Sequence, residues 1–121
     1  MPEKINLSEK FSKFSEHWTP KILGQLNGLE VKVAKFQGEF VWHQHDNTDE
    51  LFFVVEGCFT MRFRDKEVVV NAGEMIIVPR GVEHMPVAEQ EVHVVLIEDQ
   101  GTVNTGDSTA GEKTATDLEQ I

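Results

Sequence analysis

Residues 38–57 read GEFVWHQHDNTDELFFVVEG and carry the pattern of a β-hairpin. Apolar side chains predict one strand over residues 40–45 and another over residues 51–56. The four polar residues between them, 46–49, are typical of a turn. We therefore expect two antiparallel strands here, the second of which holds the longest uninterrupted apolar run of the chain, residues 51–55.

Further short strands are expected on both sides of this hairpin. The other segments with alternating or continuous apolar residues are 21–26, 29–37, 58–64, 67–70, 75–78 and 92–97. Asn27-Gly28 is a strong hairpin signal between the first two of them. About eight short strands without intervening helices predict an all-β fold, an antiparallel barrel or sandwich.

The sequence divides into three segments that differ in composition. They are an N-terminal helix or arm, a barrel, and a polar tail, at residues 1–20, 21–99 and 100–121. Ser8 is the expected cap of the N-terminal helix. The tail is rich in Gly, Thr, Ser and Asp, so we expect it to wrap the surface or to stay mobile, with Leu118 and Ile121 anchoring its end.

Length and charge restrict the class of protein. A chain of 121 residues has the size of one domain. Its formal net charge of −10 disfavours binding to nucleic acid or to anionic membrane surfaces. No apolar run is long enough to span a bilayer, and the N-terminus lacks the apolar stretch of a secretory signal. Because Cys58 is the single cysteine, no internal disulfide can form, and we expect a reducing, cytoplasmic location.

Three histidines and one glutamate stand out as candidate metal ligands. His43 and His45 lie two apart on a predicted strand and therefore point to one face. The turn would return the Glu50 carboxylate beside them, and His84 follows the break at residues 79–81. Imidazole and carboxylate groups together can hold a divalent cation. For a His-x-His pair alone, the alternative interpretation is two ordinary half-buried polar side chains.

Two spaced motifs resemble the signatures of the cupin family. They read Gly38-x4-His43-x-His45-x4-Glu50-x6-Gly57 and Gly73-x5-Pro79-x-Gly81-x2-His84. Two features depart from the usual pattern. The first glycine of the first motif is one residue closer to its histidine, and Ala88 stands where the family usually has asparagine. Neither departure changes the four candidate ligands.

The resemblance implies a small single-domain cupin: a double-stranded β-helix, or jelly-roll barrel, with a short N-terminal helix and an irregular C-terminal tail. It also implies that a divalent metal ion is held inside the barrel by four residues, His43, His45, Glu50 and His84. Iron, manganese, nickel and zinc all suit such a ligand set, whereas the absence of a thiolate argues against a closed structural zinc site. Small cupins are often similar in name to mannose-6-phosphate isomerase, but this chain lacks the size of that enzyme and an evident phosphate-binding lysine cluster.

Two functions fit these expectations. The first is a metal-dependent enzyme, a dioxygenase or an isomerase or epimerase, acting on a small sugar-derived or carboxylated metabolite. The second is a non-catalytic, metal-dependent module that binds or senses a small ligand. The sequence nominates no catalytic nucleophile, since it has no tyrosine and no Gly-x-Ser-x-Gly turn. A structural or storage role would not require four converging ligands.

Aromatic residues beside the ligands suggest self-association. Strand alternation would place Phe40 and Trp42 on the outer face of the barrel, and exposed aromatic pairs are typical of covered surfaces. The cupin resemblance implies frequent dimers. We therefore expect a homodimer that buries this pair, with Trp18 as a further candidate for the interface.

Five other side chains receive expectations of their own. Candidate anchors for a substrate carboxylate are Arg62, Arg64 and Arg80, with surface ion pairing as the alternative. His93 is a candidate acid or base beside the metal, and Cys58 is expected to be a small buried apolar residue.

Overall fold

The structure is a computed structural model that describes residues 2–108 and 111–121. Within these residues it contains one α-helix, α1 (Leu7–Phe11), and one 3-10 helix, η1 (Gly111–Lys113). Its strands are β1 (Lys21–Leu26), β2 (Leu29–Glu39), β3 (Glu50–Glu56), β4 (Cys58–Arg62), β5 (Glu67–Asn71), β6 (Met75–Val78) and β7 (Met85–Asp99). Among the described residues, no helix has the length and apolar character needed to cross a membrane.

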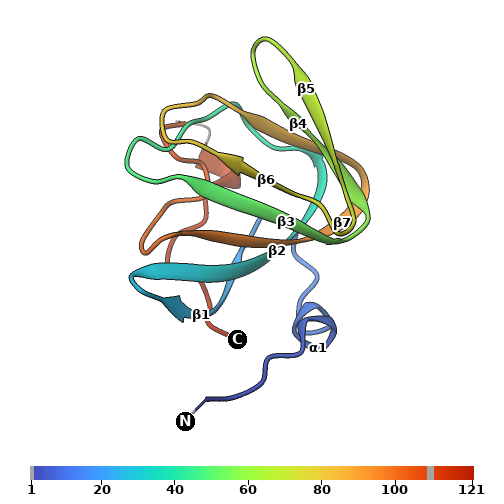
Figure 1. Ribbon diagram of the computed structural model, residues 1–121, viewed down its shortest axis with the longest axis vertical. Coiled ribbons are helices and arrows are strands. Elements are labelled where there is room, and N and C mark those ends of the chain that lie inside the picture. Colours follow the sequence, from blue (N-terminus) through green and yellow to red (C-terminus); the bar gives the residue numbers. More distant parts are fainter. Residues whose placement is uncertain (1, 109–110) are drawn as a thin grey trace.

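The strand pairs are antiparallel and are organised around β7. The order across the sheet is β1-β2-β7-β3-β6, and β4 pairs with both β5 and β7. β2 runs along one edge of β7, while residues 93–97 of β7 pair with β3 and residues 85–87 pair with β4. Figure 1 shows β4 and β5 as a hairpin at the end of the molecule opposite both termini. Because one long strand is shared in this way, the sheet curls into a jelly-roll barrel, and the predicted all-β fold is confirmed.

Strand alternation directs apolar side chains into the barrel. The main core cluster includes alternate residues of three strands, Phe52 and Val54, Phe59 and Met61, and Val92, Val94 and Leu96. Trp18, from the segment before β1, stacks on Phe36 and Phe40 with ring centroids 4.5 and 4.7 Å away. Full burial of one large apolar side chain contributes about 1.5–3 kcal/mol, so this cluster is the main source of stability.

A smaller cluster joins the N-terminal arm to the outside of β1 and β2. Its buried members are Phe11, Phe14, Leu23 and Val33. Ile121 packs against this cluster, and its N–H donates to the carbonyl of Ile22 at 3.0 Å. The expected anchoring of the tail by Ile121 is therefore present. The cap of α1 is Asn6 rather than Ser8, because the Asn6 side chain accepts the hydrogen bond from the backbone of Glu9.

The segment between β2 and β3 is a loop, so the predicted strand over residues 40–45 is wrong. β2 ends at Glu39, and the register between β2 and β7 shifts beside Gly38, whose φ is +81°. Because residues 40–45 do not continue as a strand, the two-residue alternation that the prediction assumed for them does not apply. As a result Phe40 turns into the core instead of outward.

The prediction of an exposed aromatic surface, on which a homodimer was expected to form, is therefore also wrong. Phe40 and Trp18 are 7% and 8% exposed and stack on each other inside the chain. Trp42 is half-buried, and the guanidinium carbon of Arg64 lies 3.8 Å from its ring centroid. The homodimer itself stays a prediction, which sedimentation at micromolar concentration would test.

Two further side chains differ from expectation because of strand alternation. Cys58 is exposed, since β4 directs the neighbouring Phe59 inward. His93 lies on the outside of β7, where its ring stacks on Phe11 with centroids 4.5 Å apart. The predictions of a buried cysteine and of an acid or base at the metal site are both wrong.

Candidate metal centre

Four side chains from three separate segments meet in the interior of the barrel. His43 and His45 lie in the loop after β2, Glu50 begins β3, and His84 precedes β7. The backbones of His43 and His84 are joined, because each N–H donates to the carbonyl of the other residue, at 3.1 and 2.9 Å. These two hydrogen bonds bring the second motif against the first.

The four residues form one compact group. Each offers one ligand atom, and these atoms all lie within 4.8 Å of one another. Nε2 of His45 is 3.1 Å from Oε1 of Glu50, and Nε2 of His84 is 3.8 Å from the same oxygen. The four residues are between 1% and 5% exposed. The structure thus brings together every residue that the sequence suggested as a metal ligand.

Backbone carbonyls hold two of the imidazoles in place. Nδ1 of His43 lies 2.9 Å from the carbonyl oxygen of Val41, and Nδ1 of His84 lies 2.9 Å from that of Val82. A neutral imidazole that donates from Nδ1 carries its lone pair on Nε2. The two rings are therefore oriented to ligate a metal through Nε2, the arrangement common in metalloproteins.

Three buried polar atoms of this group have no hydrogen-bond partner other than the neighbouring titratable side chains. They are Nε2 of His45, Nε2 of His84 and Oε1 of Glu50. Leaving a buried polar atom unsatisfied costs about 1–3 kcal/mol, and such atoms are rare. A divalent cation would satisfy all three atoms at once, and three imidazoles with one carboxylate suit iron, manganese, nickel or zinc. The group therefore fits a divalent metal site.

Comparison with known proteins identifies the family. The family model of the cupin domain, which is built from sequences, matches residues 29–98, more than half of the chain. The chain belongs to the cupin family. YdbB of Bacillus subtilis is 32% identical over 105 residues, which cover 78% of this chain and 87% of that protein.

Two solved structures are also similar to this chain. A cupin-2 domain containing protein from Shewanella frigidimarina shares 45% identity with a TM-score of 0.78, covering 79% of this cupin and 94% of that chain. NMB1881 from Neisseria meningitidis shares 34% identity with a TM-score of 0.74, and the match covers 81% of this chain and 100% of that chain. The predicted membership in the cupin family is confirmed.

Burial and neighbouring groups set the ionisation of the cupin's candidate ligands. Burial, followed by the nearby imidazole of His84, lowers the pKa of His43 to about 4. Burial raises the pKa of Glu50, but hydrogen bonding with two imidazoles and with Glu98 outweighs burial and holds that pKa below its usual range. Near neutral pH the site presents a neutral imidazole and a carboxylate, the forms that bind a metal.

The metal-free cupin is expected to lose stability as the pH falls from 6.5 to about 4. The pKa of His43 is 6.5 in the unfolded chain and about 4 in the folded one, so the unfolded state binds the proton more readily in this range. The contribution of His43, about 3 kcal/mol, is complete above pH 6.5 and is lost towards pH 4. Urea unfolding in EDTA across this range measures it. His43→Gln should flatten the pH dependence, and a slope equal to that of the wild type would contradict the prediction.

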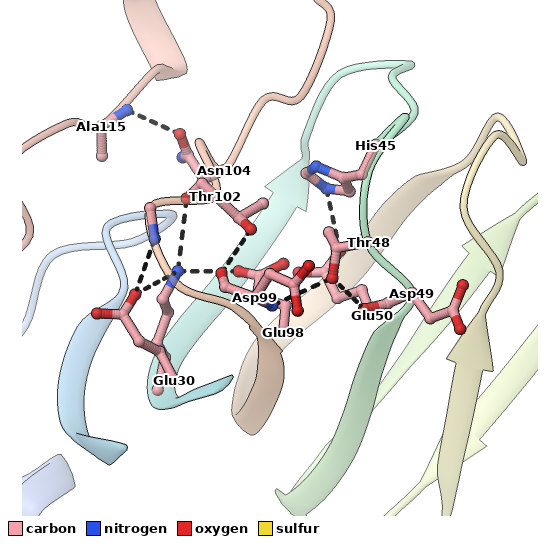
Figure 2. Close-up of polar contacts among 12 residues, drawn as sticks. Glu30, His45, Thr48, Asp49, Glu50, Glu98, Asp99, Thr102, Asn104 and Ala115 are labelled. Carbon is pink, nitrogen blue, oxygen red and sulfur yellow. Dashed lines mark hydrogen bonds and ion pairs between the residues drawn. The ribbon is translucent and has the colours of Figure 1, made fainter. Parts of the chain in front are cut away.

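A second buried group of charges adjoins the ligands, and the sequence analysis missed it. Glu98 and Lys32 are 2% and 1% exposed, and Nζ of Lys32 donates to Oε1 of Glu98 at 3.0 Å. Nζ of Lys32 also lies 3.6 Å from the carboxylate of Glu30. Figure 2 shows Glu98 between Glu30 and Glu50. Burial, and then the nearby carboxylate of Glu50, raise the pKa of Glu98 well above its usual value.

A small cavity lies against the candidate ligands. Its volume is about 20 Å³, which is room for about one water molecule. Three polar residues already described, His43, Glu50 and Glu98, contribute to its lining. Most of the remaining lining is apolar and comes from Trp18, Pro20, Phe36, Phe40, Phe52, Pro86 and Leu96. The interior next to the site is therefore largely apolar, as ligand pockets usually are.

The C-terminal tail covers the loop that carries the first two histidines. The N–H of Asp107 donates to the carbonyl of Gln44 at 3.1 Å, and the Asp107 carboxylate accepts from the N–H of Gln44 at 2.9 Å. Nζ of Lys113 donates to the carbonyls of Glu39 and Phe40. The described residues of the tail thus wrap the surface, which was one of the two expectations, and they cover one side of the metal centre.

Gly106 lies where the tail is closest to the site. A Cβ at this position would overlap the carbonyl of Gln44 and would lie 3.2 Å from Cδ2 of His43. We expect Gly106→Ala to displace the tail and to make removal of the metal by EDTA about tenfold faster, because local opening becomes easier. Gly101→Ala is the matched control: Gly101 also has a positive φ, but a Cβ there meets nothing within 4 Å. Equal rates of metal loss in both variants would count against this role of the tail.

The arginines that were suggested as substrate anchors lie on the surface. Their ion pairs are Arg62 with Glu67 at 3.0 Å, Arg64 with Glu83 at 3.0 Å and Arg80 with Asp49 at 3.4 Å. Each guanidinium therefore has a carboxylate partner in the chain itself. Surface ion pairing, the alternative interpretation, accounts for these residues.

Proposed function

We propose that this cupin is a metal-dependent enzyme, a dioxygenase or an isomerase or epimerase, acting on a small sugar-derived or carboxylated metabolite. Its proposed metal ligands are His43, His45, Glu50 and His84. The observation that carries the proposal is the convergence of four buried ligand atoms, three of which have no hydrogen-bond partner beyond the neighbouring titratable side chains. An arrangement that leaves polar atoms unsatisfied would only destabilise a protein with a purely structural role.

The residues of the chain would contribute binding and orientation. A bound divalent ion supplies Lewis acidity, which polarises a carbonyl or hydroxyl group of the metabolite. The backbone contacts of His43 and His84 fix the imidazole rings before the metal binds. The aromatic side chains of Phe40 and Phe52 line the adjacent cavity and limit the access of water to the centre.

A non-catalytic, metal-dependent module that binds or senses a small ligand is the second candidate. The observation that favours it is the closure of the site. The four ligands are at most 5% exposed, and the paired backbones of Gln44 and Asp107 hold the tail over them. A sensor tolerates slow exchange of its ligand, whereas an enzyme must release product in every turnover.

Metal analysis followed by activity assays tests the proposal. Protein purified without chelator is expected to hold about one equivalent of iron, manganese, nickel or zinc. A panel of small acids and sugars is then assayed with Fe(II), with and without oxygen, because only a dioxygenase requires oxygen. Turnover should be lost in His43→Ala and Glu50→Ala and kept in Glu83→Gln, whose side chain pairs with Arg64 on the surface.

The outcomes of these assays separate the two candidates. Thermal stabilisation by a small acid or sugar without turnover would favour the binding or sensing module. Failure of the wild-type protein to bind any divalent metal would overturn both functions, since both depend on the metal.

A further inference from the structure

The core of the barrel reaches the surface between β5 and β6. Within the described residues, β5 pairs only with β4 and β6 pairs only with β3, so no strand pairing closes the barrel on this side. Figure 1 shows the β4–β5 hairpin extending away from β6. Four half-buried apolar side chains pack against the main core cluster at this opening: Phe63, Val68, Ile76 and Val82.

These four side chains line a groove with a volume of about 480 Å³. Sites for small molecules usually have volumes of about 300–1,000 Å³ and mostly apolar walls. The cavity beside the metal centre, with its volume of about 20 Å³, shares no lining residue with this groove. The groove is therefore a separate site, and it has room for a small organic molecule.

Four charged side chains also lie at the groove, and two of them neutralise each other. The guanidinium group of Arg64 donates to both carboxylate oxygens of Glu83, at 3.1 and 3.0 Å. The other two, Asp65 and Lys66, are exposed at the turn between β4 and β5. Neither has an ion-pair partner in the described part of the chain.

Lys66 lies beside the apolar wall of the groove. Its Nζ is 5.8 Å from the centroid of the Phe63 ring, and the N–H of Phe63 donates to the carbonyl of Lys66 at 2.8 Å. An ammonium group without an acceptor is unusual in a chain with a net charge of −10. Among the described lysines and arginines, only Lys66 and Lys4 have neither a carboxylate nor a carbonyl partner. The ammonium group of Lys66 is thus available to an anion.

We propose that this groove binds a small monocarboxylate with a branched or aromatic apolar body. The body packs on the four apolar side chains, and the carboxylate pairs with the ammonium group of Lys66. One negative charge is favoured over two, because Asp65 also lies at the groove and repels further anionic charge. The site needs no metal ion, so the inference goes beyond the proposed function.

The extent of the groove favours a small molecule over a protein partner. Ten residues line the groove, whereas a stable protein interface takes about 20–30 residues on each side. A second copy of the chain would also bring a further charge of −10 towards the first.

Binding of phenylacetate to the protein in EDTA tests the proposal. The chelator ensures that the carboxylate cannot bind a metal ion. Calorimetry measures the affinity, and the shifts of backbone amide signals in NMR spectra locate the ligand. Two further probes separate the two parts of the ligand: phenylacetamide keeps the aromatic body without the charge, and acetate keeps the charge without the aromatic body.

We expect phenylacetate to bind with a Kd of about 1 mM and to shift the amide signals of residues 63–68 and 76–83. Phenylacetamide should bind about fivefold more weakly, the effect of one exposed ion pair, and acetate about tenfold more weakly or less. Lys66→Met should weaken phenylacetate about fivefold and leave phenylacetamide unchanged. Lys4→Met is the matched control, because Lys4 is exposed and equally without a partner but lies in the N-terminal arm, and it should change neither affinity.

The possible results have distinct meanings. No binding of phenylacetate to the wild type, or shifts confined to other parts of the barrel, would overturn the site. Equal affinities for phenylacetate and phenylacetamide, or equal effects of Lys66→Met and Lys4→Met, would overturn the assigned ligand class. A dimer in sedimentation that does not bind phenylacetate would mean that a second copy covers the groove, and would also overturn the proposal. Because every measurement is made in EDTA, failure of the proposed metal-dependent function would leave these results unchanged.

Discussion

Replacing His84 with alanine is expected to lower the affinity of the protein for Mn²⁺, Ni²⁺ or Zn²⁺ by about 100-fold or more. Changing a residue that only supports a metal ligand typically costs about 10–100-fold, and His84 is itself a proposed ligand. It is also the one ligand supplied by the second motif, and it is 1% exposed, so water cannot easily replace it. Metal content after purification and competition with a chelating dye measure the effect.

The metal also contributes to stability, and this contribution should disappear with His84. At a free metal concentration about 1,000 times the Kd, binding to the folded state alone stabilises the protein by about 4 kcal/mol. For a domain of this size that corresponds to a Tm increase of roughly 10–20 °C, which EDTA should abolish in the wild type. His84→Ala should show no such difference with and without EDTA. The control is Glu83→Gln, since Glu83 is the adjacent residue but pairs with Arg64 at the surface. Wild-type metal affinity in His84→Ala would remove this residue from the ligand set.

The candidate ligands were accessible to sequence reasoning because their spacing reflects simple geometry. His43 and His45 are two residues apart, and a short turn separates them from Glu50. The prediction placed the two histidines on a strand, yet they lie in a loop and still face the same side. The backbone pair between His43 and His84 supplies the local order that the missing strand would have given.

Other features depended on contacts that a single sequence does not show. Phe40 was placed outside because strand alternation was assumed within residues 40–45, but these residues form a loop after β2. The predicted strand over residues 92–97 ended one residue early, so Glu98 was omitted although it continues the inward alternation of Val94 and Leu96. An inward glutamate becomes interpretable only when its partner, Lys32, is known to lie 3.0 Å away. Such long-range pairs between distant strands are set by the topology of the barrel.

The second prediction with a large expected effect concerns the buried ion pair of Lys32 and Glu98. Lys32→Met is expected to lower the free energy of unfolding by about 3 kcal/mol near neutral pH, because it removes one partner of a buried ion pair and leaves the other uncompensated. Methionine keeps the apolar stem of the side chain, so loss of packing contributes little. Urea unfolding of the wild type and the variant measures the difference.

Two comparisons separate this electrostatic effect from general damage to the barrel. The double variant Lys32→Met/Glu98→Leu should recover most of the lost stability, since it replaces the whole pair by apolar side chains of similar volume. Lys13→Met, which changes an exposed lysine 4.0 Å from Glu9, should alter stability by less than about 0.5 kcal/mol.

The loss in free energy of unfolding caused by Lys32→Met should also become smaller as the pH is lowered. Burial and the carboxylate of Glu50 already raise the pKa of Glu98, whereas Lys32 lowers it. Without the lysine, Glu98 binds a proton more readily and becomes neutral at a higher pH than in the wild type. The difference in free energy of unfolding between the wild type and Lys32→Met therefore becomes smaller as the pH falls, because protonation removes the uncompensated charge of Glu98. A deficit that stays constant between neutral pH and about pH 5, together with no recovery in the double variant, would mean that Lys32 stabilises the barrel through packing and not through its charge.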